Sequence, residues 1–240
     1  MPGDGALATM LANHDAFAGN RVWDQLGGDQ TAYRLAAALY LLQLGTPFIY
    51  YGEEIGISGG QGLSGDPSLR TPMVWNSKAP LYGFSDAAKP FRNFSSNAAD
   101  RSVESQKHDP ASLLHHYRNL VRLRAQRLAL AQGELLSVQV NGTILQMERR
   151  LGSEHLLMIY NLGDQVQPLV SDLFLSSKKP ALIFADYPGM SREAQLILFE
   201  QQGFDKDLTV PMALRPTMPL HGGPGYLIPA GFSGVWLLAP

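Results

Sequence analysis

An amide, an imidazole and a carboxylate stand next to one another near the start of the chain, in the order Asn13-His14-Asp15. An apolar run over residues 7–11 leads into them, which is the pattern of a buried strand that ends at a polar mouth. Such a group can hold pairs of hydroxyls, or stabilise positive charge that develops during a reaction. An Asx-type turn, with Asn13 and Asp15 bonding local backbone, explains the same residues without any chemistry. Taken alone, the three residues favour the turn.

The elements that would position these side chains form a strand, a helix and a second strand. Residues 29–44 have apolar side chains at helical spacing, with Asp29 as the N-cap and Gly45 as the C-cap. The aromatic and β-branched residues 48–51 follow as a short strand. This succession is a βαβ unit, which predicts that the two strands are parallel.

The rest of the chain changes its periodicity once. Residues 52–110 contain no long periodic segment, and a helix follows to about residue 126. Beyond residue 127 apolar residues alternate, and Asn141-Gly142 predicts a two-residue hairpin turn. We expect an α/β domain over residues 1–130 and an all-β domain over residues 131–240, with a short helix at 191–202 and a loop at 211–224.

Composition excludes several classes of function. The net charge is −2 and no long cluster of Lys and Arg occurs, so we expect no nucleic-acid partner. The chain has no cysteine, which excludes thiol chemistry and disulfides. The most apolar window, residues 35–51, is interrupted by Gly45-Thr46-Pro47, so we expect no membrane span. His115 and His116 have no partners at metal-ligand spacing, and we expect no metal.

Four segments resemble the α-amylase family of glycoside hydrolases (family 13), most closely its α-glucosidase-like and trehalose synthase-like members. Residues 10–15 resemble the signature segment that ends the seventh strand of the family's TIM barrel, and residues 45–56 resemble the eighth strand with its turn. Residues 69–75 resemble an Arg-x-Pro-Met-x-Trp segment, and residues 109–124 resemble the last barrel helix. The resemblance implies the C-terminal portion of a (β/α)8 barrel, residues 1–130, followed by an antiparallel β-sandwich, residues 131–240.

The family's two main catalytic carboxylates have no counterpart in this sequence. Its nucleophile lies in a Gly-x-Arg-x-Asp segment and its general acid is a Glu at the end of the fifth strand; neither segment occurs here. Hydrolysis with retention needs both carboxylates, roughly 5 Å apart. The resemblance therefore implies a C-terminal fragment of a retaining α-glucan-active hydrolase or transglycosylase, which we expect to be inactive by itself.

The partners implied are an α-linked glucose oligosaccharide or polysaccharide and the missing N-terminal barrel portion of the parent enzyme, with no cofactor. The alternative is a non-catalytic carbohydrate-binding or interaction remnant of the family.

The resemblance also implies roles for individual residues. Asp15 would stabilise the transition state by bonding two hydroxyls of the sugar at the cleavage position, and His14 would bond a hydroxyl of the same sugar. Arg70 matches an arginine that reaches the non-reducing end of the sugar in exo-acting relatives; a structural pair with Asp66 explains it equally well.

Other residues are weaker candidates. The remaining substrate-binding candidates are Asn13, Phe17 and Tyr51, although core packing is the safer interpretation of the two aromatic residues. We expect Arg21 to brace the loop after Asp15, and Glu53 and Glu54 to bond turn backbone.

Overall fold

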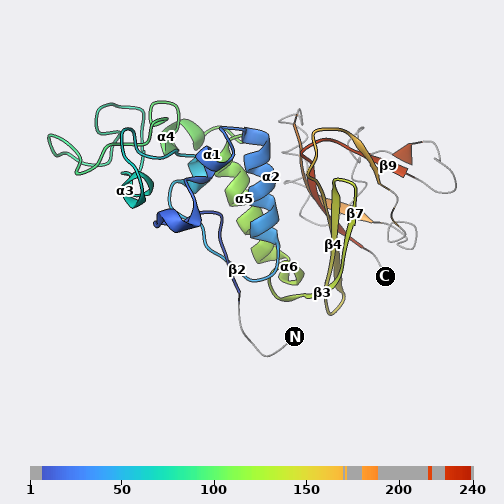
Figure 1. Cartoon of the computed structure of the whole chain (residues 1–240). Coiled ribbons are helices and arrows are strands. Elements are labelled where there is room, and N and C mark those ends of the chain that lie inside the picture. The colour runs from blue at the N-terminus through green and yellow to red at the C-terminus, as the bar shows by residue number, and fades with distance from the viewer. Residues whose placement is uncertain (1–6, 170, 172–179, 189–215, 218–224, 239–240) are drawn as a thin grey trace. The chain divides into compact units, whose positions relative to one another are not determined.

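The computed structural model describes residues 7–169, 171, 180–188, 216–217 and 225–238 (Figure 1). The helix expected at 191–202 lies outside these residues. The chain divides into two compact units, one formed by residues 1–41 and 45–121, the other by residues 42–44 and 122–240. In the described part of the chain, no helix is long and apolar enough to cross a membrane.

Two short parallel strands form the sheet of the first unit. β1 (Ala8–Thr9) pairs with β2 (Thr46–Pro47), which confirms the predicted parallel arrangement. The N–H of Thr46 donates to the carbonyl of Leu7 at 2.6 Å, and the N–H of Phe48 donates to that of Thr9 at 2.8 Å.

Both strands differ from the predicted ranges. β1 is shorter than residues 7–11, and the second strand lies at Thr46–Pro47 rather than at 48–51. Within the described residues each strand has a partner on one side only. Few hydrogen bonds between strands are therefore available to stabilise a longer strand. The proline also lacks the N–H that would donate to a ladder.

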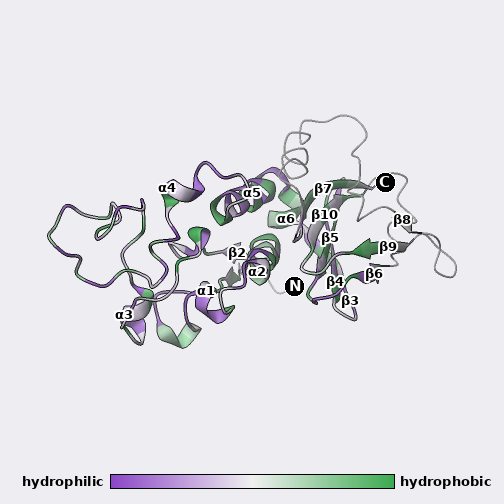
Figure 2. Cartoon of the chain, turned by 90° about the horizontal axis from the view of Figure 1, so that it is seen from above, coloured by the Kyte–Doolittle hydropathy of each residue, from purple (hydrophilic) through white to green (hydrophobic). Residues whose placement is uncertain are grey.

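Two helices pack together, and most of their residues belong to the first unit. α2 (Gln30–Leu42) connects β1 to β2, and the carboxylate of Asp29 accepts from the N–H groups of Thr31 and Ala32, at 2.8 and 3.1 Å, as an N-cap. α5 (Leu113–Gln126) carries both hydrophobic and hydrophilic residues, coloured green and purple in Figure 2. Its Tyr117 is buried, and the ring lies 6.4 Å from that of Tyr33 on α2.

The long connection between α2 and α5 has a hydrophobic core of its own. Its short elements are η2 (Glu53–Ile55), α3 (Asp66–Leu69) and α4 (Val103–Gln106). Two further short elements, η1 (Ala16–Ala18) and α1 (Val22–Gln25), lie between β1 and α2. The buried cluster consists of Ile55, Ile57, Met73, Val74, Phe94 and Ala98. Gly52, directly before η2, has φ of 80°, and a Cβ there would lie 2.2 Å from Ile57 Cδ1, so the turn requires glycine.

The second unit contains α6 (Leu128–Gln132) and two antiparallel sheets. The first sheet has the order β3-β4-β5-β10-β7, and its strands are β3 (Glu134–Asn141), β4 (Ile144–Leu151), β5 (Glu154–Asn161), β10 (Ser233–Leu237) and β7 (Ala181–Asp186). The second has the order β6-β9-β8, with β6 (Gln167–Leu169), β9 (Gly225–Ile228) and β8 (Pro216–Thr217). β8 corrects the expectation that residues 211–224 form only a loop, since it pairs with β9.

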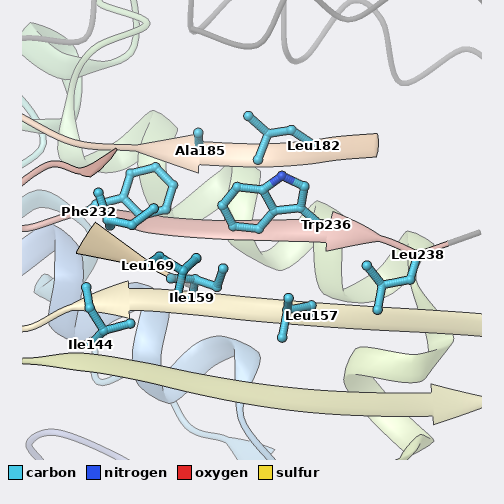
Figure 3. Close-up of a cluster of buried hydrophobic side chains, with 10 residues drawn as sticks. Ile144, Leu157, Ile159, Leu169, Leu182, Ala185, Phe232, Trp236 and Leu238 are labelled. Atoms are coloured by element: carbon cyan, nitrogen blue, oxygen red, sulfur yellow. The ribbon is translucent and has the colours of Figure 1, made fainter. Parts of the chain in front are cut away.

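One hydrophobic cluster joins the two sheets (Figure 3). Leu157, Ile159 and Trp236 come from the larger sheet, whereas Leu169 and Ile228 come from the smaller one. β3 and β4 form the predicted hairpin, but its turn lies at residues 142–143 rather than at 141–142, because Asn141 still pairs with Ile144; Gly142 has φ of 59°.

Candidate functional site

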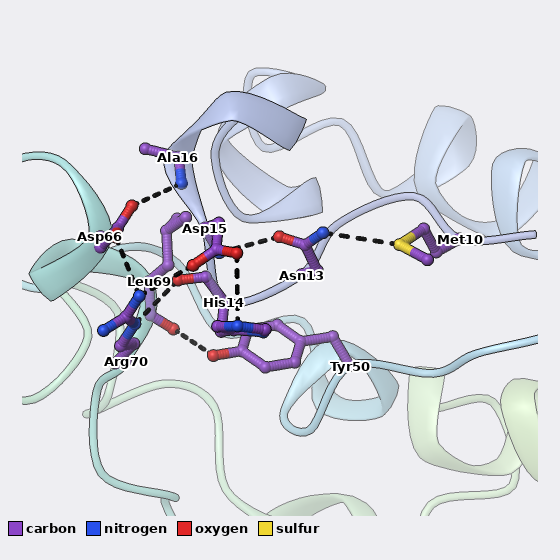
Figure 4. Close-up of polar contacts among 9 residues, drawn as sticks. All are labelled: Met10, Asn13, His14, Asp15, Ala16, Tyr50, Asp66, Leu69 and Arg70. Atoms are coloured by element: carbon purple, nitrogen blue, oxygen red, sulfur yellow. Dashed lines mark hydrogen bonds and ion pairs between the residues drawn. The ribbon is translucent and has the colours of Figure 1, made fainter.

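Asp15 lies between a histidine and an arginine, just beyond β1 (Figure 4). Its Oδ1 is 2.8 Å from Nη2 of Arg70, and its Oδ2 is 3.3 Å from Nε2 of His14. The carboxylate does not cap the following helix η1. The turn interpretation is therefore wrong for the Asp15 side chain, whose partners are side chains of the predicted site.

The turn interpretation is correct for Asn13. Its Oδ1 accepts a hydrogen bond from the N–H of Asp15 at 2.8 Å, which is an Asx turn. In the described part of the chain, the partner of its Nδ2 is the sulfur of Met10, at a long distance of 3.6 Å. Asn13 thus holds the backbone from which the Asp15 side chain projects.

Arg70 binds three acceptors. Its Nε donates to the carbonyl of His14 at 2.9 Å, and its Nη2 is 2.8 Å from both Asp15 Oδ1 and Asp66 Oδ2. The predicted pair with Asp66 is therefore present, together with a pair to Asp15 that was not predicted. Its Nη1 has no hydrogen-bonding partner among the described residues, so Arg70 keeps donors for a further group.

The sequence indicated Asp66 only as a partner of Arg70, and not as a residue of the site. Besides Arg70, it accepts a hydrogen bond from the N–H of Ala16 at 2.8 Å, across 50 positions of sequence. The spacing of four residues between Asp66 and Arg70 is a sequence signal for their pair. The contact with Ala16 has no such signal, because it depends on how two loops meet.

The two aromatic candidates differ in their surroundings. Phe17 is 86% exposed, so core packing is wrong for it. Tyr51 is 40% exposed, and its hydroxyl donates to the carbonyl of Thr71 at 2.6 Å. With Arg70, it lines a cavity of about 330 Å³, whose other lining residues are Thr71, Pro72, Met73, Phe84, Phe91 and Arg92. This volume is at the lower end of the range for small-molecule sites.

Arg21 is buried and ties its loop to the segment after β2. Its Nη1 donates to the carbonyl of Tyr51 at 2.6 Å, and its guanidinium lies 4.3 and 4.7 Å from the ring centroids of Tyr50 and Tyr51. Cation–π contacts of this kind are attractive when the cation is desolvated. Arg21 braces the loop as expected, and the structure shows that its partners are the two tyrosines.

Glu53 has different partners from those expected. Its Oε1 accepts hydrogen bonds from the hydroxyls of Tyr40, at 2.5 Å, and Tyr117, at 2.8 Å, neither of which the sequence predicted. The hydroxyl of Tyr33 donates to its carbonyl at 2.9 Å. Burial raises the pKa of Glu53 to about 7, although the two tyrosine hydrogen bonds act in the opposite direction.

Residues 1–133 match the catalytic domain of α-amylase. The chain is 34% identical, over 179 residues, to a probable α-glucosidase of Rhizobium meliloti (strain 1021); the match covers 68% of this chain and 32% of that protein. It is 32% identical, over 180 residues, to a trehalose synthase of Thermus thermophilus, covering 70% of this chain and 18% of that protein. The chain thus spans a third or less of the length of these relatives.

Two solved structures share the fold of almost the whole chain. An α-amylase from H. orenii has a TM-score of 0.65 and 27% identity, and the match covers 96% of this chain and 39% of that one. An isomaltulose synthase from Erwinia rhapontici NX5 has a TM-score of 0.69 and 20% identity, covering 98% and 43%. The sequence match to the catalytic domain extends over more than half of the 240 residues, and the chain belongs to the α-amylase family of glycoside hydrolases.

Proposed function

We propose that this chain supplies one wall of the active site of a retaining glycoside hydrolase or transglycosylase that acts on α-glucosidic bonds. The observation that carries the proposal is the group formed by Asp15, His14 and Arg70 directly after β1. In TIM-barrel enzymes the catalytic residues lie where the barrel strands end at their carboxyl side.

The substrate is an α-linked glucose oligosaccharide or polysaccharide, as the names of the α-glucosidase and α-amylase relatives suggest. Asp15 bonds two hydroxyls of the sugar at the cleavage position, and these bonds strengthen as the ring flattens toward an oxocarbenium ion. His14 bonds a hydroxyl of the same sugar, and Nη1 of Arg70 reaches its non-reducing end. A single guanidinium shared by Asp15 and Asp66 leaves the group net negative, which suits a cationic transition state.

The other candidates act at the edge of this site. Phe17 and Tyr51 offer exposed ring surface on which a sugar face can stack. Asn13 contributes through the turn that holds Asp15.

In this proposal the nucleophile and the general acid belong to an N-terminal barrel portion that is not part of this chain. Residues 1–130 are the last two strands of the barrel with their helices, and residues 131–240 are a C-terminal β-sandwich. Two strands cannot close a barrel, and the absence of both signature segments from the sequence supports the same division. We use "complete enzyme" for this chain joined to such an N-terminal portion.

The test is the substitution Asp15→Asn in the complete enzyme. The amide keeps the size of the side chain but loses its charge and turns one acceptor into a donor. We expect kcat to fall by roughly 10² to 10³ with a much smaller change in KM, which is the size of effect seen when one preorganised interaction is removed.

The control is Asp29→Asn, at a carboxylate whose partners among the described residues are the backbone N–H groups of Thr31 and Ala32 in α2. Asparagine is a good N-cap, so this variant should keep both kcat and the thermal midpoint. A kcat for Asp15→Asn close to that of the unchanged enzyme would end the proposal.

A further inference from the structure

We propose that Asp66 is a positioning residue of this site, which fixes the orientation of Asp15 by holding both the backbone next to it and the arginine that pairs with it. The proposal rests on the function proposed for Asp15. Asp66 lies in α3, and 51 positions of sequence separate it from Asp15.

The two oxygens of Asp66 have different partners (Figure 4). Oδ1 accepts from the N–H of Ala16, the residue that follows Asp15, at 2.8 Å. Oδ2 accepts from Nη2 of Arg70 at 2.8 Å, and the same nitrogen donates to Asp15 Oδ1. One carboxylate therefore holds Asp15 from its backbone side and, through Arg70, from its side-chain side.

The segment that carries Asp66 is itself anchored. The hydroxyl of Tyr50, which follows β2, donates to the carbonyl of Leu69 at 3.0 Å, and the Nε of Arg70 donates to the carbonyl of His14 at 2.9 Å. Residues 66–70 are thus fixed to the segments after both strands of the sheet. Because this segment is anchored at two places, Asp66 and Arg70 can hold Asp15 in one orientation.

Asp66 also limits how strongly Arg70 engages Asp15. The Nη2 of Arg70 lies at the same distance from both carboxylates. Without Asp66, that donor would be left to Asp15 alone, and the oxygen of Asp15 would be less available to a sugar hydroxyl. Because both carboxylates and Arg70 are between 33% and 43% exposed, solvent screens the pair, and we expect the effect on geometry to exceed the effect on stability.

The first experiment uses the 240-residue chain as it is. Amide hydrogen exchange at Ala16 should rise on the order of tenfold in Asp66→Ala, since the N–H loses its acceptor. In Asp66→Asn the remaining carbonyl oxygen can still accept from Ala16, so exchange should stay near the original rate. Asp29→Ala, which removes an unrelated cap, should leave Ala16 unchanged. Equal exchange rates at Ala16 in the unchanged chain and in Asp66→Ala would refute the proposal that Asp66 holds the backbone next to Asp15.

The second experiment is a double-mutant cycle in the complete enzyme. We expect Asp66→Ala to lower kcat about tenfold with little change in KM, and Asp66→Asn to lower it less. In the Asp15→Asn background, Asp66→Ala should lower kcat no further, because its effect passes through Asp15. An unchanged kcat in Asp66→Ala, or the same loss in both backgrounds, would overturn the positioning role.

The two proposals fail in different ways. If Asp15→Asn keeps full activity, the function proposed for Asp15 fails and the role of Asp66 fails with it. If Asp15→Asn collapses kcat while Asp66→Ala leaves it unchanged, only the role of Asp66 fails. Asp66→Asn keeps the experiment informative if Asp66→Ala does not fold.

Discussion

Asn13 and Asp15 stand two positions apart, yet their side-chain oxygens serve different purposes. The oxygen of Asn13 is committed to the N–H of Asp15, whereas the oxygens of Asp15 face Arg70 and His14. The Asx turn and the cluster of Asp15 with His14 and Arg70 therefore coexist in the same few residues. The turn holds the backbone in the conformation that directs the carboxylate toward Arg70.

Asn13 can be tested by two substitutions. Asn13→Ala removes the acceptor of the Asp15 N–H, and we expect a loss of about 0.5 to 1.5 kcal/mol in the free energy of unfolding. Asn13→Asp keeps an acceptor at the same place and should preserve stability, as measured by urea unfolding of the chain. If Asn13→Asp nevertheless raises KM in the complete enzyme, the Nδ2 group contacts sugar directly. Equal stability of both variants would show that the turn does not depend on this bond.

At the scale of elements, α2 and α5 meet around the side chain of Glu53. The carboxylate comes from η2, and its tyrosine partners come one from each helix. Its Oε2 is buried without a hydrogen-bond partner among the described residues, so burial favours the neutral form. Glu54 is adjacent, and burial raises its pKa as well.

The raised pKa of Glu53 predicts a dependence of stability on pH. The folded-state value of about 7 lies above the ordinary value of 4.5, so folding favours the protonated form. The contribution of Glu53 to stability is therefore fully present below pH 4.5 and is lost as pH rises through about 7. A pKa difference of this size corresponds to an upper limit of roughly 3 to 4 kcal/mol.

The measurement compares urea unfolding of the chain and of Glu53→Gln between pH 4.5 and 7.5. Glutamine does not titrate and keeps an oxygen for the tyrosine hydroxyls, so the variant should gain stability relative to the chain as the pH rises. Other carboxylates contribute equally to both proteins, and Glu54→Gln serves as a companion with a shift of the same sign. Parallel pH profiles for the chain and Glu53→Gln would refute the prediction.

At the scale of the whole molecule, the chain belongs to the α-amylase family and spans a third or less of the α-glucosidase and trehalose synthase relatives. β1 and β2 pair only with each other among the described residues, and Leu7, Phe48 and Ile49 beside them are exposed. Open strand edges and bare apolar side chains of this kind favour association. They are the surface on which we propose that the N-terminal barrel portion docks.

We predict that the isolated chain has no turnover on maltose, starch or an aryl α-glucoside. In the proposed function Asp15 stabilises the transition state, but the sequence contains neither the segment of the nucleophile nor that of the general acid, and removing such groups costs many orders of magnitude in rate. The Asp15→Asn chain, purified in parallel, identifies contaminating glycosidase, whose activity would be the same in both preparations. Turnover that depends on Asp15 would show that this chain is catalytic by itself.

The sequence by itself determined the features that depend on neighbours along the chain. The cap at Asp29, the hairpin after Asn141, the parallel strand order and the family all follow from local residue patterns. Each of these patterns consists of residues that lie close together in the sequence, so it can be recognised without knowledge of the fold.

Only the tertiary structure decided how the loops meet. The bond from Ala16 to Asp66, the pair of Arg70 with Asp15 and the tyrosines around Glu53 join residues between 13 and 64 positions apart. The limits of β1 and β2 also depended on which neighbours each strand has. The contacts among Asp15, Ala16, Asp66 and Arg70 arise because parallel strands bring their carboxyl ends, and the loops that follow them, to one edge of the sheet. No local pattern records which side chains meet there, so Asp66 was assigned to the site by its position in space.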